Sequence, residues 1–105
     1  MTKVTVMAGP CKFTTTITAT LSDFSDITLN IDSECPHFKE LNNELNEVDA
    51  FNELGMSRTP GIVKETVEKY AKHKTCPVCI GILKAIEVEA NLALPVNPQI
   101  TIEKE

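Results

Sequence analysis

The sequence predicts an α+β fold: a three-stranded antiparallel meander plus a C-terminal strand, with three to four helices packed on one face of the sheet. Apolar and polar residues alternate through the first third of the chain, which is the period of half-buried strands. After residue 35 the apolar spacing changes to that of a helical stripe. A length of 105 residues, 42% of them hydrophobic, suits one domain over residues 1–105.

Three strands account for the first third of the sequence. Residues 3–8 and 13–21 alternate apolar residues with mostly threonine positions, and residues 26–32 repeat the pattern after a polar turn. Because each connection is short, the three strands are expected to pair as an antiparallel meander. The side chains of these strands that we expect in the core are Val4, Phe13, Ile17, Leu29 and Ile31.

The second half of the chain is predicted to be mainly helical, starting with residues 38–54, whose apolar stripe is broken near Val48. A Thr-Pro pair, an N-cap followed by proline at the first helical position, predicts a second helix over residues 59–73. The third helix, over residues 75–94, is apolar almost all round and is expected to be the most buried. Alternation at residues 100–102 predicts the final strand. From these elements we expect Leu41, Val67, Ile82, Ile86 and Ile102 in the core.

Composition and charge exclude several classes of function. The formal net charge is −5 and the ten basic residues are scattered, so the chain lacks the cationic surface that a nucleic-acid partner requires. No apolar run approaches the roughly 20 residues that span a bilayer, and the N-terminal segment does not resemble a secretory signal. We therefore expect a cytoplasmic protein with no membrane association, in which cysteine thiols stay reduced.

The four cysteines are the residues on which a function can be based. The meander brings Cys11 and Cys35 to one end of the sheet. If the helices alternate in direction, Cys76 and Cys79 reach the same end, whereas an extra reversal between Val48 and Thr59 would place them at the opposite end. In an extended chain, residues of equal parity share a face of the sheet. Cys11 and Cys35 have the odd numbering of the inward strand residues, so both thiols are expected to point toward the helical layer. Four thiolates would supply the tetrahedral ligand set of zinc or of an iron–sulfur cluster.

Local sequence supports thiol chemistry at two of these positions. Cys35 and Cys76 each precede a proline at the start of a helical segment, where free backbone N–H groups stabilise a thiolate. His37 and His73 lie close by in the sequence and could replace one cysteine as a ligand, although each reads more simply as a surface histidine. The leading interpretation is therefore a small metal-binding protein.

Three alternatives accompany this interpretation. A thiol–disulfide redox protein would use Cys76 as the attacking thiol and Cys79 as the resolving thiol, but too few elements follow this motif for a thioredoxin-like fold. Buried cysteines also serve simply as small hydrophobic residues. A metal-free interaction module would present a polar face of threonines to a protein partner that the sequence does not specify. The threonines of that face are Thr14, Thr16, Thr18 and Thr20.

Catalytic motifs are otherwise missing from the sequence. There is no Ser-His-Asp arrangement, no glycine-rich phosphate loop and no convincing carboxylate pair. The acidic residues of the helical segments read as solvated helix faces. The sequence therefore predicts no enzyme active site beyond the thiol chemistry of the redox alternative.

Three segments resemble a family of small uncharacterised single-domain proteins of anaerobic microbes, a domain of unknown function. They are residues 8–13 (Ala-Gly-Pro-Cys-Lys-Phe), residues 76–88, which begin Cys-Pro-Val-Cys, and residues 92–95. The resemblance covers nearly the whole chain and implies a coherent single fold and an anaerobic setting, with no assigned activity. It also implies that a cysteine matching Cys79 is not always present, which gives more weight to Cys11, Cys35 and Cys76.

Overall fold

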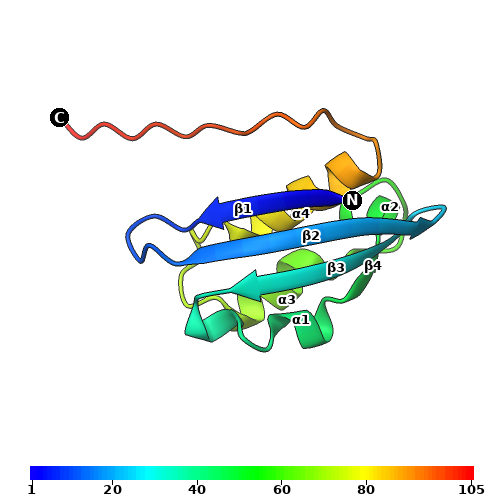
Figure 1. The fold of residues 1–105 in the computed structure, drawn as a ribbon, viewed down its shortest axis with the longest axis horizontal. Coiled ribbons are helices and arrows are strands. Elements are labelled where there is room, and N and C mark those ends of the chain that lie inside the picture. Colours follow the sequence, from blue (N-terminus) through cyan, green and yellow to red (C-terminus); the bar gives the residue numbers. More distant parts are fainter.

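Four strands form one antiparallel sheet in the order β1–β2–β3–β4 in the computed structural model, which describes residues 1–105 (Figure 1). The strands are β1 (Thr2–Met7), β2 (Thr14–Asp23), β3 (Asp26–Ser33) and β4 (Glu47–Asp49). Val4 lies opposite Ile17, which in turn lies opposite Ile31. The predicted meander is therefore confirmed, and its inward and outward residues alternate as the period of two requires.

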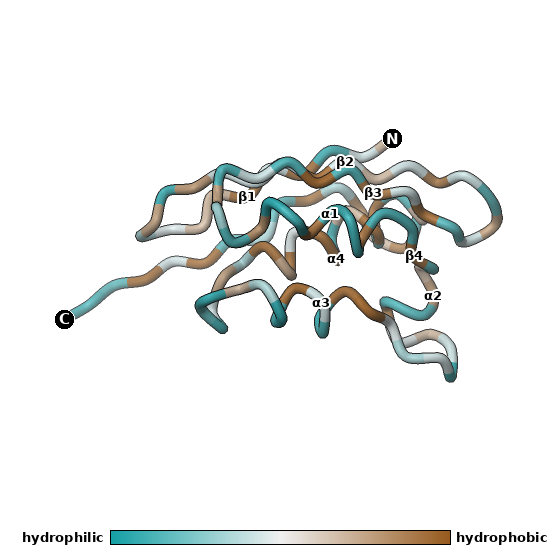
Figure 2. Tube along the Cα trace, turned by 90° about the horizontal axis from the view of Figure 1, so that it is seen from below, coloured by the Kyte–Doolittle hydropathy of each residue, from teal (hydrophilic) through white to brown (hydrophobic).

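The helices lie on one side of this sheet, so that the molecule has two layers (Figure 2). They are a short 3₁₀ helix (Pro36–Phe38), α1 (Leu41–Glu44), α2 (Ala50–Glu53), α3 (Val63–Tyr70) and α4 (Val78–Glu89). None of them combines the length and the apolar character that crossing a lipid bilayer demands. The α+β class predicted from the sequence is confirmed.

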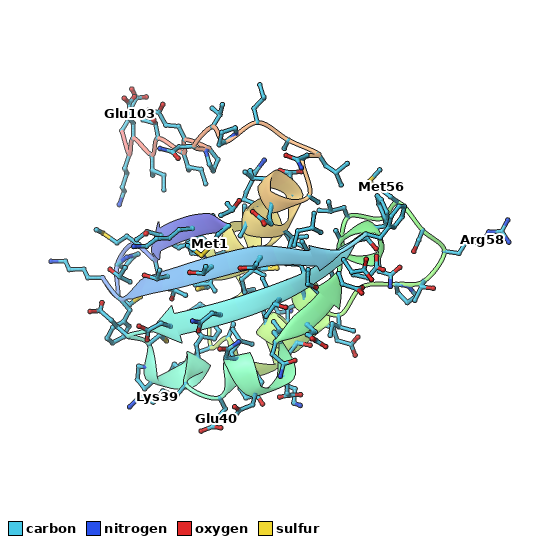
Figure 3. The ribbon with its side chains drawn as sticks, turned by 45° about the vertical axis from the view of Figure 1, so that its right-hand side comes forward. Met1, Lys39, Glu40, Met56, Arg58 and Glu103 are labelled. Carbon is cyan, nitrogen blue, oxygen red and sulfur yellow. The ribbon has the colours of Figure 1, made fainter.

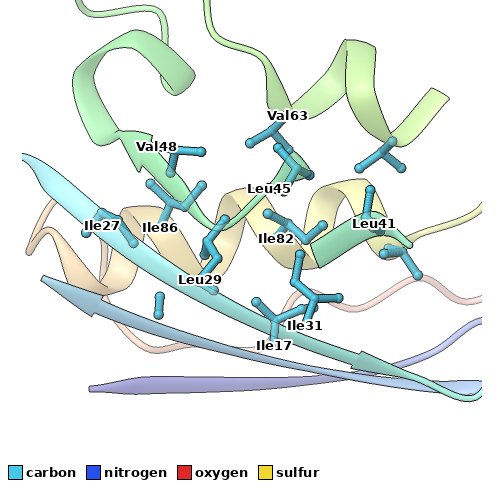
Figure 4. Packing of buried hydrophobic residues seen from close by; sticks show 14 of the residues in the cluster. Ile17, Ile27, Leu29, Ile31, Leu41, Leu45, Val48, Val63, Ile82 and Ile86 are labelled. Carbon is cyan, nitrogen blue, oxygen red and sulfur yellow. The ribbon is translucent and has the colours of Figure 1, made fainter. Parts of the chain in front are cut away.

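The core lies between the sheet and α4, with contributions from α1 and α3 (Figure 4). Ile82 and Ile86 of α4 are completely buried against strand residues such as Ile17. Seven of the ten predicted core residues are buried: Ile17, Leu29, Ile31, Leu41, Val67, Ile82 and Ile86. Val4 is only partly buried, because β1 is an edge strand with no neighbour on its outer side.

The helix predicted over residues 38–54 is present only as short pieces, but the break predicted near Val48 is confirmed and the apolar stripe marks the right side chains. Phe38, Leu41, Leu45 and Val48 are all buried. The chain between them is a succession of short pieces, because Val48 pairs with Ile27 in the sheet and so forms β4 instead of continuing a helix.

The next helix starts later than predicted, at Val63 and not at Thr59. The N-terminus of this helix is capped by a residue from an earlier segment of the chain. The carboxylate of Glu53 accepts hydrogen bonds from the N–H groups of Ile62 and Val63, each at 2.9 Å. Gly61 leaves room for this carboxylate, since a Cβ there would lie 2.2 Å from Glu53 Oε1. The third helix is likewise shorter than predicted, ending at Glu89 instead of residue 94.

The predicted C-terminal strand is also absent. Residues 95–105 run as an extended segment that belongs to no sheet, and Ile102 is 87% exposed. The fourth strand of the sheet is β4 instead. Phe13 is 36% exposed, because it lies in the β1–β2 connection, just outside the paired part of β2.

Candidate thiol site

One end of the sheet carries all the segments that contain cysteine. There β1 ends, β2 begins and β3 ends, so the connections that hold Cys11 and Cys35 lie at this end. The opposite end of α4 is fixed by Glu89, whose carboxylate accepts hydrogen bonds from Thr2 Oγ1 (2.8 Å) and the N–H of Leu21 (2.9 Å). Since Thr2 and Leu21 mark the other end of the sheet, α4 must begin at the end that we call the thiol end.

Cys11 lies in the loop between β1 and β2 and is exposed to solvent. The loop is closed by hydrogen bonds from the N–H of Ala8 to the carbonyl of Phe13 (3.1 Å) and from the N–H of Lys12 to the carbonyl of Gly9 (2.9 Å). Gly9 and Lys12 have φ angles of 93° and 60°, which end the extended backbone. The predicted inward orientation of the Cys11 thiol is therefore wrong.

Cys35 follows β3 and precedes the 3₁₀ helix. Its N–H donates a hydrogen bond to Ser33 Oγ at 3.1 Å, and its side chain is half-buried against the hydrophobic core. The inward orientation predicted for this thiol agrees with that packing. Its neighbour His37 is exposed, as is His73.

Cys76 and Cys79 lie at the start of α4. Cys76 comes just before the helix, where its N–H donates to the carbonyl of His73 at 3.3 Å, and Cys79 lies within the first turn. Both side chains are half-buried against the core. Burial raises the pKa of the Cys79 thiol, and the nearby carboxylate of Glu68 raises it further against the opposing charge of Lys64. Cys79 is therefore a protonated, poorly nucleophilic thiol at neutral pH.

The four cysteines share an end of the molecule without forming a ready metal site. All four are free thiols. No three His, Cys, Asp or Glu side chains are grouped so that they could hold a metal ion. The fold thus brings the four cysteine segments to one end of the molecule. Only Cys76 and Cys79 are close in the sequence, three residues apart at the start of α4.

A groove along β1 is a feature that sequence reasoning missed. It has a volume of about 670 Å³ and lies between β1, the start of α4 and the C-terminal segment, and Cys76 is one of its lining residues. The groove is shallow at Gly81, where a Cβ would lie 2.3 Å from Val6 Cγ2, so α4 packs unusually close to β1. A glycine inside an otherwise apolar helix was the sequence signal for this close approach.

The threonine face is on the side of the sheet that has no helices. Thr14, Thr16 and Thr18 are half-buried and Thr20 is exposed. Thr16 lies opposite Asp32 of β3, so the cross-strand neighbours on this face are polar as well. Strand propensity accounts for such a row of β-branched residues.

Residues 2–102 match a family of unknown function, DUF6951. The chain belongs to this family. No curated protein and no solved structure matches the chain. Membership of DUF6951 covers nearly the whole domain, including both cysteine-containing loops and α4, so the thiol end belongs to the region that the family shares.

Proposed function

We propose that this DUF6951 protein is a small metal-binding protein whose thiol end holds zinc or an iron–sulfur cluster. The observation that carries the proposal is the shared position of the four cysteine segments at one end of the sheet. The ligands are Cys76 and Cys79 from the start of α4, Cys35 from the end of β3 and Cys11 from the β1–β2 loop. Soft thiolate ligands of this number suit either centre.

Binding requires the cysteine segments to move closer together, the exposed Cys11 loop included, because no three of the candidate ligands are grouped. The loop is suited to this movement: Cys11 is exposed, and the loop is held by only two backbone hydrogen bonds besides the strands. Cys35 and Cys79 already pack against the core and form the fixed side of the site. A metal ion would also lower the pKa of the Cys79 thiol, offsetting the increase caused by burial.

The proposal places the protein in the reducing cytoplasm of an oxygen-poor cell. Four free thiols in a chain of 105 residues remain available as ligands only where disulfides do not form. An iron–sulfur cluster further requires protection from oxygen. A fractionation experiment on the native organism, probing the cytoplasmic and membrane fractions, tests this placement.

A second candidate is a dithiol–disulfide protein, favoured by the Cys76/Cys79 spacing and by the protonated Cys79 thiol. The Cys76 thiolate would attack a disulfide of a protein substrate, forming a mixed disulfide and releasing one substrate thiolate. The Cys79 thiol would lose its proton to solvent and attack the Cys76 sulfur, releasing the second substrate thiolate. The substrate gains two electrons and the chain retains a Cys76–Cys79 disulfide.

Elemental analysis and a visible spectrum of protein purified without oxygen test both candidates. The metal proposal predicts zinc, or iron with sulfide absorption bands, and the loss of that metal in Cys76→Ser and Cys35→Ser. Thr75→Ala is the matched control, since Thr75 is exposed next to Cys76 and is not a candidate ligand. Metal-free protein that forms a reversible Cys76–Cys79 disulfide would support the second candidate. Metal-free protein without that disulfide would reject both.

A further inference from the structure

The outer edge of β1 is an open row of backbone hydrogen-bonding groups. The N–H of Ala8 bonds the carbonyl of Phe13, a pair that continues the β1–β2 register. Because bonded and non-bonded pairs alternate in antiparallel strands, the even residues of β1 bond β2. The N–H and C=O groups of Lys3, Thr5 and Met7 therefore point away from β2, at the free edge of the sheet.

The groove beside this edge is apolar at its base and basic at its rim. Val4, Val6 and Ile80 are among its apolar residues, and Ile80 is 53% exposed. Its charged lining residues are Lys3, Lys74 and Lys84, of which Lys84 is paired with Glu87 at 2.9 Å, and no acidic residue lines the groove itself. This rim is unusual for a chain with a formal net charge of −5. An extended apolar segment followed by acidic residues complements this surface.

The C-terminal segment has this chemistry. In its own copy it lines the outer side of the groove through residues 95–98 and Ile100, but it forms no backbone hydrogen bond to β1, so an exchange would move it from its own groove to that of the partner. Val96 and Ile100 are 70% and 82% exposed, and the only backbone hydrogen bond of residues 95–105 is the one from the N–H of Val96 to the carbonyl of Leu94 (2.8 Å). The segment runs alongside β1 without pairing with it (Figure 1), and Glu103 stands clear of the body of the molecule (Figure 3).

Proline fixes which side of this segment can pair. Pro98 has no N–H to donate. In a paired strand its backbone groups must therefore lie on the side away from the partner strand. The odd residues Asn97, Gln99 and Thr101 then direct their backbone groups to the partner. This parity places Ile100 and Ile102 on one face, the face that an apolar groove can cover. Pro98 at the outer edge also prevents a further strand from adding.

We propose that residues 96–102 of a second copy of this chain bind along the β1 edge, so that two copies exchange C-terminal segments in a symmetric dimer. Each copy presents both a free edge and an unpartnered segment, and a two-fold exchange satisfies both at once without leading to open-ended assembly. Glu103 and Glu105 follow the paired residues and approach the lysine rim. The exchanged segment covers Cys76 of the partner, since Cys76 lines the groove.

Light scattering during size exclusion of the full chain, over a range of concentrations, measures the dimer directly. Thr5→Pro removes an outward N–H without disturbing the β1–β2 ladder, and the matched control Thr5→Ala keeps it. Ile100→Asp/Ile102→Asp makes the segment polar, and Leu94→Asp is its control at another exposed position. We expect Thr5→Pro and the double Asp variant to weaken the dimer at least about ten-fold in Kd, whereas both controls keep it.

Mixing the two weakened variants distinguishes exchange from other arrangements. The Thr5→Pro chain retains an intact C-terminal segment and the double Asp chain retains an intact groove, so a heterodimer should form from two monomers. In that mixture, alkylation of Cys76 in the double Asp chain should slow. A wild-type monomer at every concentration, a dimer that survives both substitutions, or a mixture that stays monomeric would each overturn the proposal. Protection of the Thr5 N–H from hydrogen exchange in a monomer would instead assign the groove to the chain's own segment and also overturn it.

Discussion

The two edges of the sheet are built in opposite ways. At the β4 edge only three residues pair with β3, and the chain that follows is held by local hydrogen bonds, such as the one that the N–H of Phe51 donates to Asp49 Oδ1 at 2.9 Å. At the β1 edge six residues pair with β2, and no strand pairs with the outer side. A short strand in a network of local caps protects one edge, whereas the long open strand leaves the other ready for addition.

The difference extends to how each edge is attached to the helical layer. The β4 edge is connected through Asp49, which caps α2 directly after the strand. The β1 edge is attached by α4, more than 70 residues away in the sequence, through the Gly81–Val6 approach and the Glu89 hydrogen bonds. Substitutions should therefore act at the β1 edge through long-range packing and at the β4 edge through local capping.

Gly81→Ala should have the largest effect of the substitutions considered for the two edges. The new Cβ would overlap Val6 Cγ2 at 2.3 Å, so α4 and β1 must separate. We expect a loss of about 1–3 kcal/mol in the free energy of unfolding by urea, despite the better helix propensity of alanine. The double variant Val6→Ala/Gly81→Ala should recover part of this loss. A single variant as stable as the wild type would contradict the close approach.

Asp49→Ala should weaken the β4 edge by a smaller amount. Asp49 Oδ1 accepts hydrogen bonds from the N–H groups of Phe51 (2.9 Å) and Asn52 (3.2 Å), and both are lost. We expect a decrease of about 1–2 kcal/mol in stability, measured by urea unfolding. Asn is an equally good cap, so Asp49→Asn should retain most of the stability. Equal losses in the two variants would show that capping is not the cause.

Glu89→Gln should have the smallest effect at neutral pH, about 1 kcal/mol. Burial alone would raise the pKa of Glu89, but hydrogen bonds from the Leu21 N–H and the Thr2 hydroxyl, with the Met1 amino group at 3.2 Å, outweigh it and lower the pKa below its ordinary value of 4.5. A lowered folded-state pKa gives stability that is complete above the unfolded-state value and is lost as the pH falls through the folded-state value.

The stability difference between wild type and Glu89→Gln should therefore be full at pH 7 and shrink steadily below about pH 4.5. Urea unfolding at a series of pH values measures it. Glu87→Gln is the control, because the Glu87 carboxylate is bonded only to the side chain of Lys84, at 2.9 Å. A difference between wild type and Glu89→Gln that is independent of pH would reject the charged role of Glu89.

The same contrast explains what the sequence could predict of the fold. Alternation identified the meander, because a period of two has one simple geometric meaning in a sheet. The stripe through Phe38 and Val48 identified buried side chains but not the path between them, since short turns and a strand can bury the same positions as a helix. Nothing local to residues 59–63 indicated that Glu53 would cap α3.

The thiol end was predictable only at the level of topology. Strand order and helix direction brought the cysteine segments to one end, as the sequence indicated. The orientation of the Cys11 thiol depends instead on two residues, Gly9 and Lys12, whose left-handed backbone ends the alternation. Parity arguments hold only as far as the backbone stays extended, and a six-residue loop is long enough to break them.

The Glu89 hydrogen bonds also have a kinetic consequence. The bond to Thr2 joins residues 87 positions apart, so it closes almost the whole chain into one loop. The meander can form from neighbouring segments, whereas docking α4 on β1 must wait for that loop to close. Folding should therefore pass through a transition state in which the hairpins are built and Glu89 is still free. In a stopped-flow chevron, Glu89→Gln should accelerate unfolding and leave the folding rate nearly unchanged.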